Sequence, residues 1–209
     1  GDRIVFIDEN GEVVPSSIIG AIMSRYFLSK IQKDKIVYAA TVSQIVPEVI
    51  EAYGGQAVRE KVGHTFIKRK LQEIDGGFAC ENSGHYFFRK NFYADSAIIS
   101  FLVMLDILSG QKKSLSALSR GFSKYASSPE INFTVTDPKG AVRKAAEKFV
   151  GFDTDWLDGL TVRTENFWLN LRPSNTEPLL RLTLEARDEL TLERVKKDIT
   201  ELVLSLSED

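Results

Sequence analysis

The most informative feature of this sequence for its fold lies between residues 35 and 110. There, short apolar runs alternate with helical segments. The run KIVYAATV, residues 35–42, is apolar and β-branched, and a helical pattern that begins near Ser43 follows it. Pro47 falls in the first turn of that helix, where proline is tolerated, and Gly54-Gly55 ends it. Strands that alternate with helices predict a sheet covered by helices.

The alternation continues along the chain. We expect short strands at QAVRE and FACEN and a helix from His64 to Ile74. Asp95 is expected to cap a nearly all-apolar helix that runs to Leu108. A helix that is apolar on most sides is expected to be buried on most sides.

The first thirty residues predict a hairpin followed by a helix. Asn-Gly in the segment ENG is a strong turn signal, and it predicts a hairpin over residues 3–15. Ser16 or Ser17 is expected to cap a helix that runs to Lys30.

After residue 110 the chain becomes more polar, and Ser127-Ser128-Pro129 is a candidate hinge. Beyond it the pattern predicts one strand, a helix from Pro138 to Val150, three more strands and a last helix with one apolar stripe. The predicted fold class is therefore α/β. A mixed α/β-sheet domain over residues 16–124 precedes a smaller α+β domain over residues 125–209, which has a four-stranded sheet.

Composition sets limits on function. The chain has 209 residues, of which 43% are hydrophobic and 27% charged, so a buried core is expected. A net charge of −2 provides no cationic field for nucleic acid or a membrane surface, and the apolar run between Ser96 and Leu108 is too short to cross a bilayer. The single cysteine, Cys80, fits a reducing compartment. We therefore expect a soluble, cytoplasmic protein with no nucleic-acid or membrane partner.

The segment RPSNTEP concentrates hydrogen-bond donors on a turn between two predicted strands. Arg172 presents a planar fork that matches phosphate oxygens, and Ser174, Asn175 and Thr176 could complete a small anion-binding cup. The alternative is a polar hairpin turn with a solvent-facing arginine, because Ser, Asn and Pro are ordinary turn residues.

The segment CENSGHYFF places a carboxylate, a hydroxyl and an imidazole, from Glu81, Ser83 and His85, within five residues. Gly84 allows an unusual backbone angle between them. Such a set suits recognition of vicinal hydroxyls and proton transfer. The other histidine, His64, also follows a glycine, and either histidine alone is more often structural or simply exposed.

Together these segments resemble the α-D-phosphohexomutase family, which includes phosphomannomutase, phosphoglucomutase and phosphoglucosamine mutase. CENSGH is similar to the family's sugar-binding loop G-E-x-S-G-H, with Cys80 in place of the first glycine. RPSNT is similar to its phosphate-binding loop R-x-S-N-T, and GDR to the tail of its metal loop D-G-D-x-D-R. The resemblance covers only the C-terminal part of such an enzyme, and its details favour the phosphomannomutase branch.

The resemblance implies the interconversion of hexose 6-phosphates and hexose 1-phosphates through a phosphoserine and a hexose 1,6-bisphosphate, with Mg²⁺. It also implies roles for individual residues. The expected substrate-binding residues are Glu81, Ser83, His85, Arg172, Ser174, Asn175 and Thr176, the expected catalytic residues are Arg3, His64 and His85, and the expected metal ligand is Asp2.

Two departures from the family pattern limit what this chain can do alone. No segment resembles the family's serine loop T-[AS]-S-H-[NP], and Asp2 stands without the first two aspartates of the metal loop. We therefore expect residues 1–15 to be the closing hairpin of a truncated second domain, with the missing N-terminal domains as partner, and the chain alone to be inactive. The alternatives are a phosphoglucomutase or phosphoglucosamine mutase, a stand-alone sugar-phosphate-binding module, and a structural domain with decayed loops.

Overall fold

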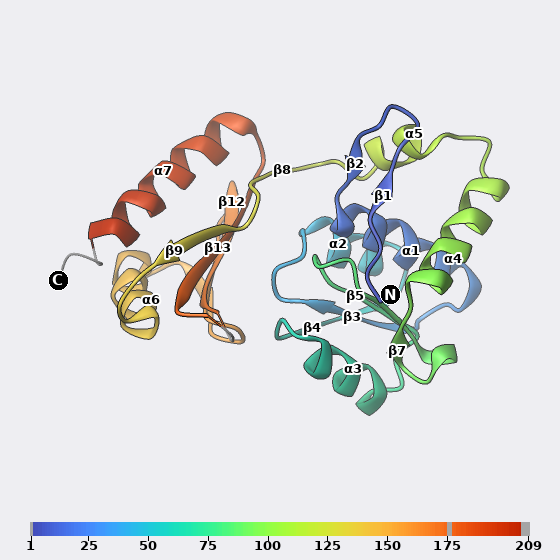
Figure 1. The fold of residues 1–209 in the computed structure, drawn as a ribbon, viewed down its shortest axis with the longest axis horizontal. Coiled ribbons are helices and arrows are strands. Elements are labelled where there is room, and N and C mark those ends of the chain that lie inside the picture. The colour runs from blue at the N-terminus through green and yellow to red at the C-terminus, as the bar shows by residue number, and fades with distance from the viewer. Residues whose placement is uncertain (1, 175–176, 206–209) are drawn as a thin grey trace. The chain divides into compact units, whose positions relative to one another are not determined.

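The structure, a computed structural model, describes residues 2–174 and 177–205. The chain divides into two compact units between Lys124 and Tyr125 (Figure 1). Each unit has its own sheet and its own helices.

The first unit is built on a five-stranded mixed sheet with the order β4-β3-β5-β6-β7. Strand β3 pairs in parallel with β4 on one side and β5 on the other, and β6 and β7 continue the sheet in antiparallel pairing. The strands are β3 (Lys35–Ala39), β4 (Gln56–Glu60), β5 (Phe78–Cys80), β6 (Tyr86–Phe88) and β7 (Ala94–Asp95). The two parallel pairings follow from the helical crossovers that the alternating pattern predicted.

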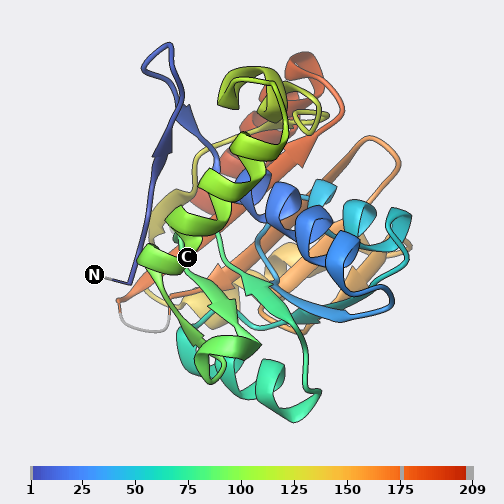
Figure 2. The same cartoon turned by 90° about the vertical axis from the view of Figure 1, so that its right-hand side faces the viewer.

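Helices cover both faces of this sheet. Figures 1 and 2 show α1 (Ser16–Lys30) and α2 (Ile45–Ala52) on one face and α3 (His64–Glu73) on the other. The core between these layers is fully buried, and its largest side chains include Ile19, Ile22, Ile36, Ile67, Leu71 and Phe78. The remaining elements of the unit are the hairpin β1 (Phe6–Ile7) and β2 (Val13–Val14), the 3₁₀ turn η1 (Arg89–Asn91), α4 (Ala97–Gly110) and α5 (Leu115–Arg120).

Two predicted helix caps are wrong. Helix α1 starts after Pro15 without a side-chain cap, and Ser17 is instead buried and donates a hydrogen bond to Asn82. Helix α4 is capped by Ser96, whose hydroxyl accepts a hydrogen bond from the backbone N–H of Ile99. Asp95 lies one residue earlier, at the end of β7, and its carboxylate is engaged elsewhere.

The expectation that α4 is buried on most sides is also wrong. Only Ser100, Met104 and Ile107 of this helix are buried. The side chains of Ile98, Phe101, Leu102 and Leu105 are 71%, 49%, 56% and 44% exposed. The helix has apolar side chains on all its sides. Because it lies at the surface of its unit, only one narrow stripe of these side chains is buried.

The second unit has a six-stranded antiparallel sheet with the order β10-β11-β12-β13-β8, and β9 also pairs with β13. The strands are β8 (Ala126–Ser127), β9 (Ile131–Thr134), β10 (Asp153–Asp155), β11 (Leu160–Arg163), β12 (Phe167–Pro173) and β13 (Leu179–Ala186). Two strands exceed the four expected, because β8 and β10 are too short to show an alternating pattern. Of the candidate hinge residues, Ser127 belongs to β8, and the backbone N–H of Ser128 donates to the carbonyl of Leu184 in β13.

One face of the second sheet carries the core of its unit. Helices α6 (Pro138–Ala146) and α7 (Glu189–Ser205) contact β12, β13 and each other, and the 3₁₀ turn η2 (Glu147–Phe149) follows α6. Leu180, Leu182 and Leu184 alternate along β13 and are fully buried. The intervening positions of β12 and β13 point to the opposite face and carry the polar side chains discussed below.

No helix in the described part of the chain combines the length and the hydropathy needed to span a membrane.

Candidate functional site

The segment CENSGH forms a tight loop between β5 and β6. Within it the backbone N–H of Glu81 donates to the carbonyl of His85, and the N–H of Gly84 donates to the carbonyl of Glu81. Asn82 is held from both sides, because its amide accepts from Ser17 and donates to the carbonyl of Thr41. The loop is therefore fixed by the sheet and by α1.

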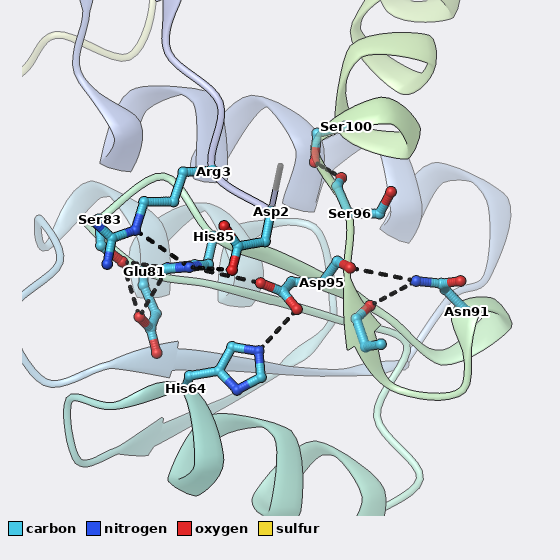
Figure 3. A network of polar contacts seen from close by, with 11 residues as sticks. Asp2, Arg3, His64, Glu81, Ser83, His85, Asn91, Asp95, Ser96 and Ser100 are labelled. Carbon is cyan, nitrogen blue, oxygen red and sulfur yellow. Dashed lines mark hydrogen bonds and ion pairs between the residues drawn. The ribbon is translucent and has the colours of Figure 1, made fainter.

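A polar relay runs through the three side chains of this loop (Figure 3). The hydroxyl of Ser83 donates to Oε2 of Glu81 at 2.9 Å, and it lies 2.8 Å from Nδ1 of His85. Because the hydroxyl has only one proton, it accepts from Nδ1–H of His85, and the lone pair of that ring is at Nε2. The side chains of Glu81 and His85 are only 5% and 7% exposed. Within the described residues, Oε1 of Glu81 is buried and has no hydrogen-bond partner.

Gly84 brings the N-terminal segment to this loop. Its φ of +82° is in the left-handed region, and a Cβ built there would lie 2.6 Å from the carbonyl oxygen of Ile4. The backbone N–H of Ile4 in turn donates to the carbonyl of Gly84 at 3.1 Å. Glycine is thus required on both counts, and the contact carries Asp2 and Arg3 to His85.

The structure brings together the candidates Asp2, Arg3, His64 and His85. Nε of Arg3 donates to Nε2 of His85 at 3.4 Å, and Oδ2 of Asp2 lies 3.6 Å from the same nitrogen. The rings of His64 and His85 pack edge to face, with their centroids 5.7 Å apart. A hydrogen bond from its own backbone lowers the pKa of Asp2, so that its carboxylate is ionised at neutral pH.

Asp95 is a residue of this cluster that sequence reasoning missed. Its Oδ1 lies 2.8 Å from Nε2 of His64 and its Oδ2 lies 3.7 Å from Nε2 of His85, so one carboxylate faces both histidines (Figure 3). Its side chain is only 8% exposed. The sequence signal was ambiguous, because an aspartate before an apolar helical run is the ordinary pattern of an N-cap.

The residues near Asp2 do not by themselves form the magnesium site that the resemblance implies. Mg²⁺ takes near-octahedral oxygen ligands and usually keeps several waters. Asp2 supplies one carboxylate, which is 62% exposed, and Nε2 of His85, a nitrogen rather than an oxygen ligand, lies 3.6 Å from its Oδ2.

In the second unit, Arg172 belongs to an ionic cluster on the polar face of the sheet. Its Nη2 lies 3.1 Å from Oε2 of Glu130, and Nη1 of Arg181 lies 3.3 Å from Oε1 of the same carboxylate. Glu177 pairs with Arg181 at 2.8 Å. The side chain of Arg172 is only 5% exposed, so it is not the solvent-facing arginine of an ordinary hairpin turn.

The other predicted members of this loop are only partly described. The backbone N–H of Ser174 donates to the carbonyl of Leu179 and closes the turn at 2.8 Å. Asn175 and Thr176 lie outside the described residues. Sequence reasoning missed Glu130 and Arg181. The register of the hairpin pointed to Arg181, because it is the direct cross-strand partner of Arg172.

Cys80 occupies a buried position at the base of the first loop. Its sulfur packs against α1, where a Cβ at Gly20 would lie 2.9 Å from Sγ. Burial, with a smaller contribution from Glu81, raises the pKa of the thiol to about 12. Cys80 therefore serves packing rather than nucleophilic chemistry.

Comparison with known proteins identifies the family. The profile of the phosphoglucomutase/phosphomannomutase α/β/α domain III matches residues 15–125, and that of the phosphoglucomutase/phosphomannomutase C-terminal domain matches residues 130–202. The chain belongs to the phosphoglucomutase/phosphomannomutase family, which confirms the predicted resemblance to the phosphohexomutases and the predicted α/β fold class.

Individual relatives agree with this assignment. A phosphomannomutase of Methanocaldococcus jannaschii is 45% identical over 206 residues, which are 99% of this chain and 46% of the relative. The crystal structure of a phosphoglucomutase/phosphomannomutase family protein from Burkholderia thailandensis has a TM-score of 0.87 at 27% identity, covering 98% of this chain and 44% of that one.

A more distant structure shares the fold. The N-acetylphosphoglucosamine mutase of Aspergillus fumigatus, in complex with GlcNAc-6P and magnesium, has a TM-score of 0.72 at 15% identity, covering 99% of this chain and 47% of that one. The chain thus spans about half the length of the relatives it matches.

Proposed function

We propose that this chain is the sugar- and phosphate-recognising part of a phosphohexomutase that interconverts hexose 6-phosphates and hexose 1-phosphates, with mannose as the preferred hexose. The observation that carries the proposal is the buried relay of Glu81, Ser83 and His85 on a loop that the fold holds rigid. The name and 45% identity of the Methanocaldococcus jannaschii relative support the preference for mannose.

Glu81 is the sugar ligand in this proposal. One of its oxygens accepts from Ser83, and within the described residues the other is a buried acceptor without a partner. A buried carboxylate oxygen without a hydrogen bond is costly, and a sugar hydroxyl would supply the missing donor. Ser83 keeps the carboxylate in place, so the site is preorganised for a hydroxyl-bearing ligand.

His85, His64 and Arg3 handle the proton and steady the reacting phosphate. The lone pair of His85 is at Nε2, because Ser83 accepts from Nδ1–H, and the guanidinium of Arg3 lies beside that lone pair. His85 can therefore accept a proton from a reacting hydroxyl at Nε2, and Arg3 offers a cation for phosphate oxygens. Asp95 orients His64 through its hydrogen bond to Nε2.

Arg172 holds the phosphate that does not react, together with Ser174, Asn175 and Thr176. The guanidinium groups of Arg172 and Arg181 both contact Glu130, which presents two oxygens as a phosphate would. A bound phosphate would contact the same guanidinium groups, either beside Glu130 or in its place. Arginine forks suit carboxylate and phosphate alike.

Further parts of the proposal concern the whole protein. Residues 16–124 act as the sugar-binding domain and residues 125–209 as the phosphate-binding domain, while residues 1–15 close a preceding domain. The phosphoserine, most of the Mg²⁺ ligands and the handling of the hexose 1,6-bisphosphate belong to N-terminal domains of the same enzyme. We place the enzyme in the cytoplasm, which the single buried cysteine fits.

A coupled assay of the full-length protein on mannose 1-phosphate and glucose 1-phosphate tests the proposal. We expect turnover of both, with a preference for mannose, and none from the 209-residue chain alone. Glu81→Gln should reduce kcat/KM on both sugars, since an amide offers one acceptor oxygen instead of two. Glu73→Gln, on the exposed side of α3, is the matched control. Wild-type kinetics in the Glu81 variant would overturn the assignment of the site.

Calorimetric titration with a hexose phosphate tests the proposed role of Arg172 in phosphate binding. Arg172→Ala should weaken hexose-phosphate binding by roughly 1.5–3 kcal/mol, the cost of losing a charged hydrogen-bonding partner. An unchanged affinity in a folded Arg172 variant would place the phosphate elsewhere.

A further inference from the structure

The turn between η1 and β7 has a strained backbone. Phe92 and Tyr93 are consecutive residues with φ of +55° and +59°, in the left-handed region that bulky side chains rarely adopt. Phe92 is 87% exposed, so burial of its ring does not explain the conformation. Strain of this kind persists only where the surrounding contacts enforce it, and it concentrates at functional sites.

The side chain of Asn91 closes this turn. Its Nδ2 donates to the carbonyl of Ala94 at 3.2 Å and lies 3.5 Å from the carbonyl oxygen of Asp95. An amide nitrogen has two protons, so one side chain holds two successive carbonyls. The backbone N–H of Tyr93 adds a hydrogen bond to the carbonyl of Phe88 at 3.0 Å.

The turn determines where the carboxylate of Asp95 points. Figure 3 shows the amide of Asn91 on one side of Asp95 and the two histidines on the other. Oδ1 of Asp95 lies 2.8 Å from Nε2 of His64, and Oδ2 lies 3.7 Å from Nε2 of His85. Oδ2 is buried and has no hydrogen-bond partner among the described residues. A carboxylate with so few tethers of its own depends for its position on the backbone that Asn91 holds.

We propose that Asn91 is a positioning residue of the site. Its amide aims Asp95 at the two histidines, and Asp95 in turn fixes the ring of His64. A carboxylate oxygen accepts, so Nε2 of His64 carries a proton in both the neutral and the charged ring. The side chain of His64 is 42% exposed, so burial alone does not fix its ring.

The consequence for the reaction rests on the proposed function. There His64 handles a proton or steadies the reacting phosphate, and a displaced ring slows the chemical step more than it weakens binding. Asn91→Ala should therefore reduce kcat of the full-length enzyme about tenfold and change KM by less than about twofold. The positioning itself is measured without an activity assay.

Nitrogen-15 NMR of the 209-residue chain tests the positioning. The chain has two histidines, and His64→Gln assigns their signals. In the neutral ring, at alkaline pH, the shifts of His64 should show one tautomer, with the proton on Nε2. Asp95→Ala removes the acceptor and should move these shifts towards those of a mixture of tautomers. Asn91→Ala should produce at least about half of that change.

Two further variants separate positioning from general damage. Lys90→Ala, an exposed change in the same 3₁₀ turn, should leave the His64 shifts at their wild-type values. Phe92→Gly allows the left-handed backbone without strain. When it is combined with Asn91→Ala, the His64 shifts should return at least about halfway to wild type. Circular dichroism of each variant establishes that it is folded.

Another tether of the turn provides an independent test. The hydroxyl of Tyr93 donates to Oδ1 of Asp75 at 2.7 Å, and Tyr93→Phe removes this bond. The His64 shifts should change in the same direction as in Asn91→Ala, by a smaller amount. This variant keeps the aromatic ring, so it tests the turn even where Asn91→Ala impairs folding.

Two outcomes would overturn the inference. The first is wild-type His64 shifts in the folded Asn91→Ala and Tyr93→Phe chains although Asp95→Ala alters them. The second is an equal change in Lys90→Ala. Altered His64 shifts together with wild-type kcat in Asn91→Ala would instead overturn the proposed role of His64 in the reaction, and the positioning by Asn91 would stand.

Discussion

Arg172 and Arg181 are direct cross-strand partners on β12 and β13, and both form ion pairs with Glu130. Like charges in directly opposed positions of a sheet destabilise it. The carboxylate of Glu130 balances the pair, with one oxygen for each guanidinium. Two guanidinium groups this close together need a compensating anion, and Glu130 provides one.

Glu130→Gln should therefore lower the free energy of unfolding of the 209-residue chain by about 1–2 kcal/mol. Removing one partner leaves the largely buried charge of Arg172 uncompensated, and the partial exposure of Glu130 keeps the loss below that of a fully buried pair. Urea unfolding measures the change. Glu165→Gln, an exposed change in the same unit, should stay within about 0.5 kcal/mol of wild type. Equal stability of the Glu130 variant and wild type would contradict the pairing.

Acid should loosen the N-terminal hairpin. Hydrogen bonds from Ser114 and Ser116 lower the pKa of Glu9 from its ordinary 4.5 to about 2. A lowered pKa in the folded state means that this contact stabilises the fold fully above pH 4.5, and that the contribution is lost as the pH falls from about 4.5 towards 2. Amide hydrogen exchange in β1 and β2 should therefore accelerate over this window relative to β3.

Glu9→Gln serves as the control for the acid prediction. The amide cannot titrate, so hairpin exchange in this variant should be faster than wild type at pH 6 and should not gain the further acid-dependent increase. A hairpin whose protection relative to β3 is the same at pH 6 and pH 3 in the wild-type chain would show that the contact between Glu9 and the serines is unimportant.

The thiol of Cys80 should be inert in the folded chain. Its pKa of about 12 leaves a thiolate fraction of roughly one in ten thousand at pH 8, and the side chain is buried against α1. In buffer, a thiol reagent should modify Cys80 only as fast as the chain unfolds. In denaturing urea it should modify Cys80 rapidly. Rapid stoichiometric reaction of the native chain would mean that the loop before β6 opens readily.

Helix α4 should tolerate substitutions on its exposed side far better than on its buried side. Met104 is 2% exposed, so Met104→Ala should cost about 2–5 kcal/mol of stability. Leu102 is 56% exposed, so Leu102→Gln should change stability by less than about 0.5 kcal/mol. Urea unfolding of both variants checks this contrast. A large loss in the Leu102 variant would mean that the exposed side is packed in the 209-residue chain.

The sequence by itself determined the longer helices, the longer strands and the two loops that carry the chemistry, but not the short strands β6, β7, β8 and β10. Those features are local. Strand alternation, helical periodicity and turn residues act over a few neighbours, and so do the side chains of Glu81, Ser83 and His85, which lie in one turn. The family resemblance rested on the same short segments, and the matching profiles of both domains confirmed it.

Only the tertiary structure decided which distant groups meet. Asp95 faces the two histidines because β7 follows β6 in the sheet, although its sequence position suggested a helix cap. Glu130 balances two arginines of another hairpin because β9 pairs with β13. Helix α4 leaves an apolar side exposed although its composition predicted burial. In each case the energy depends on contacts between residues far apart in sequence, and local periodicity contains no information about them.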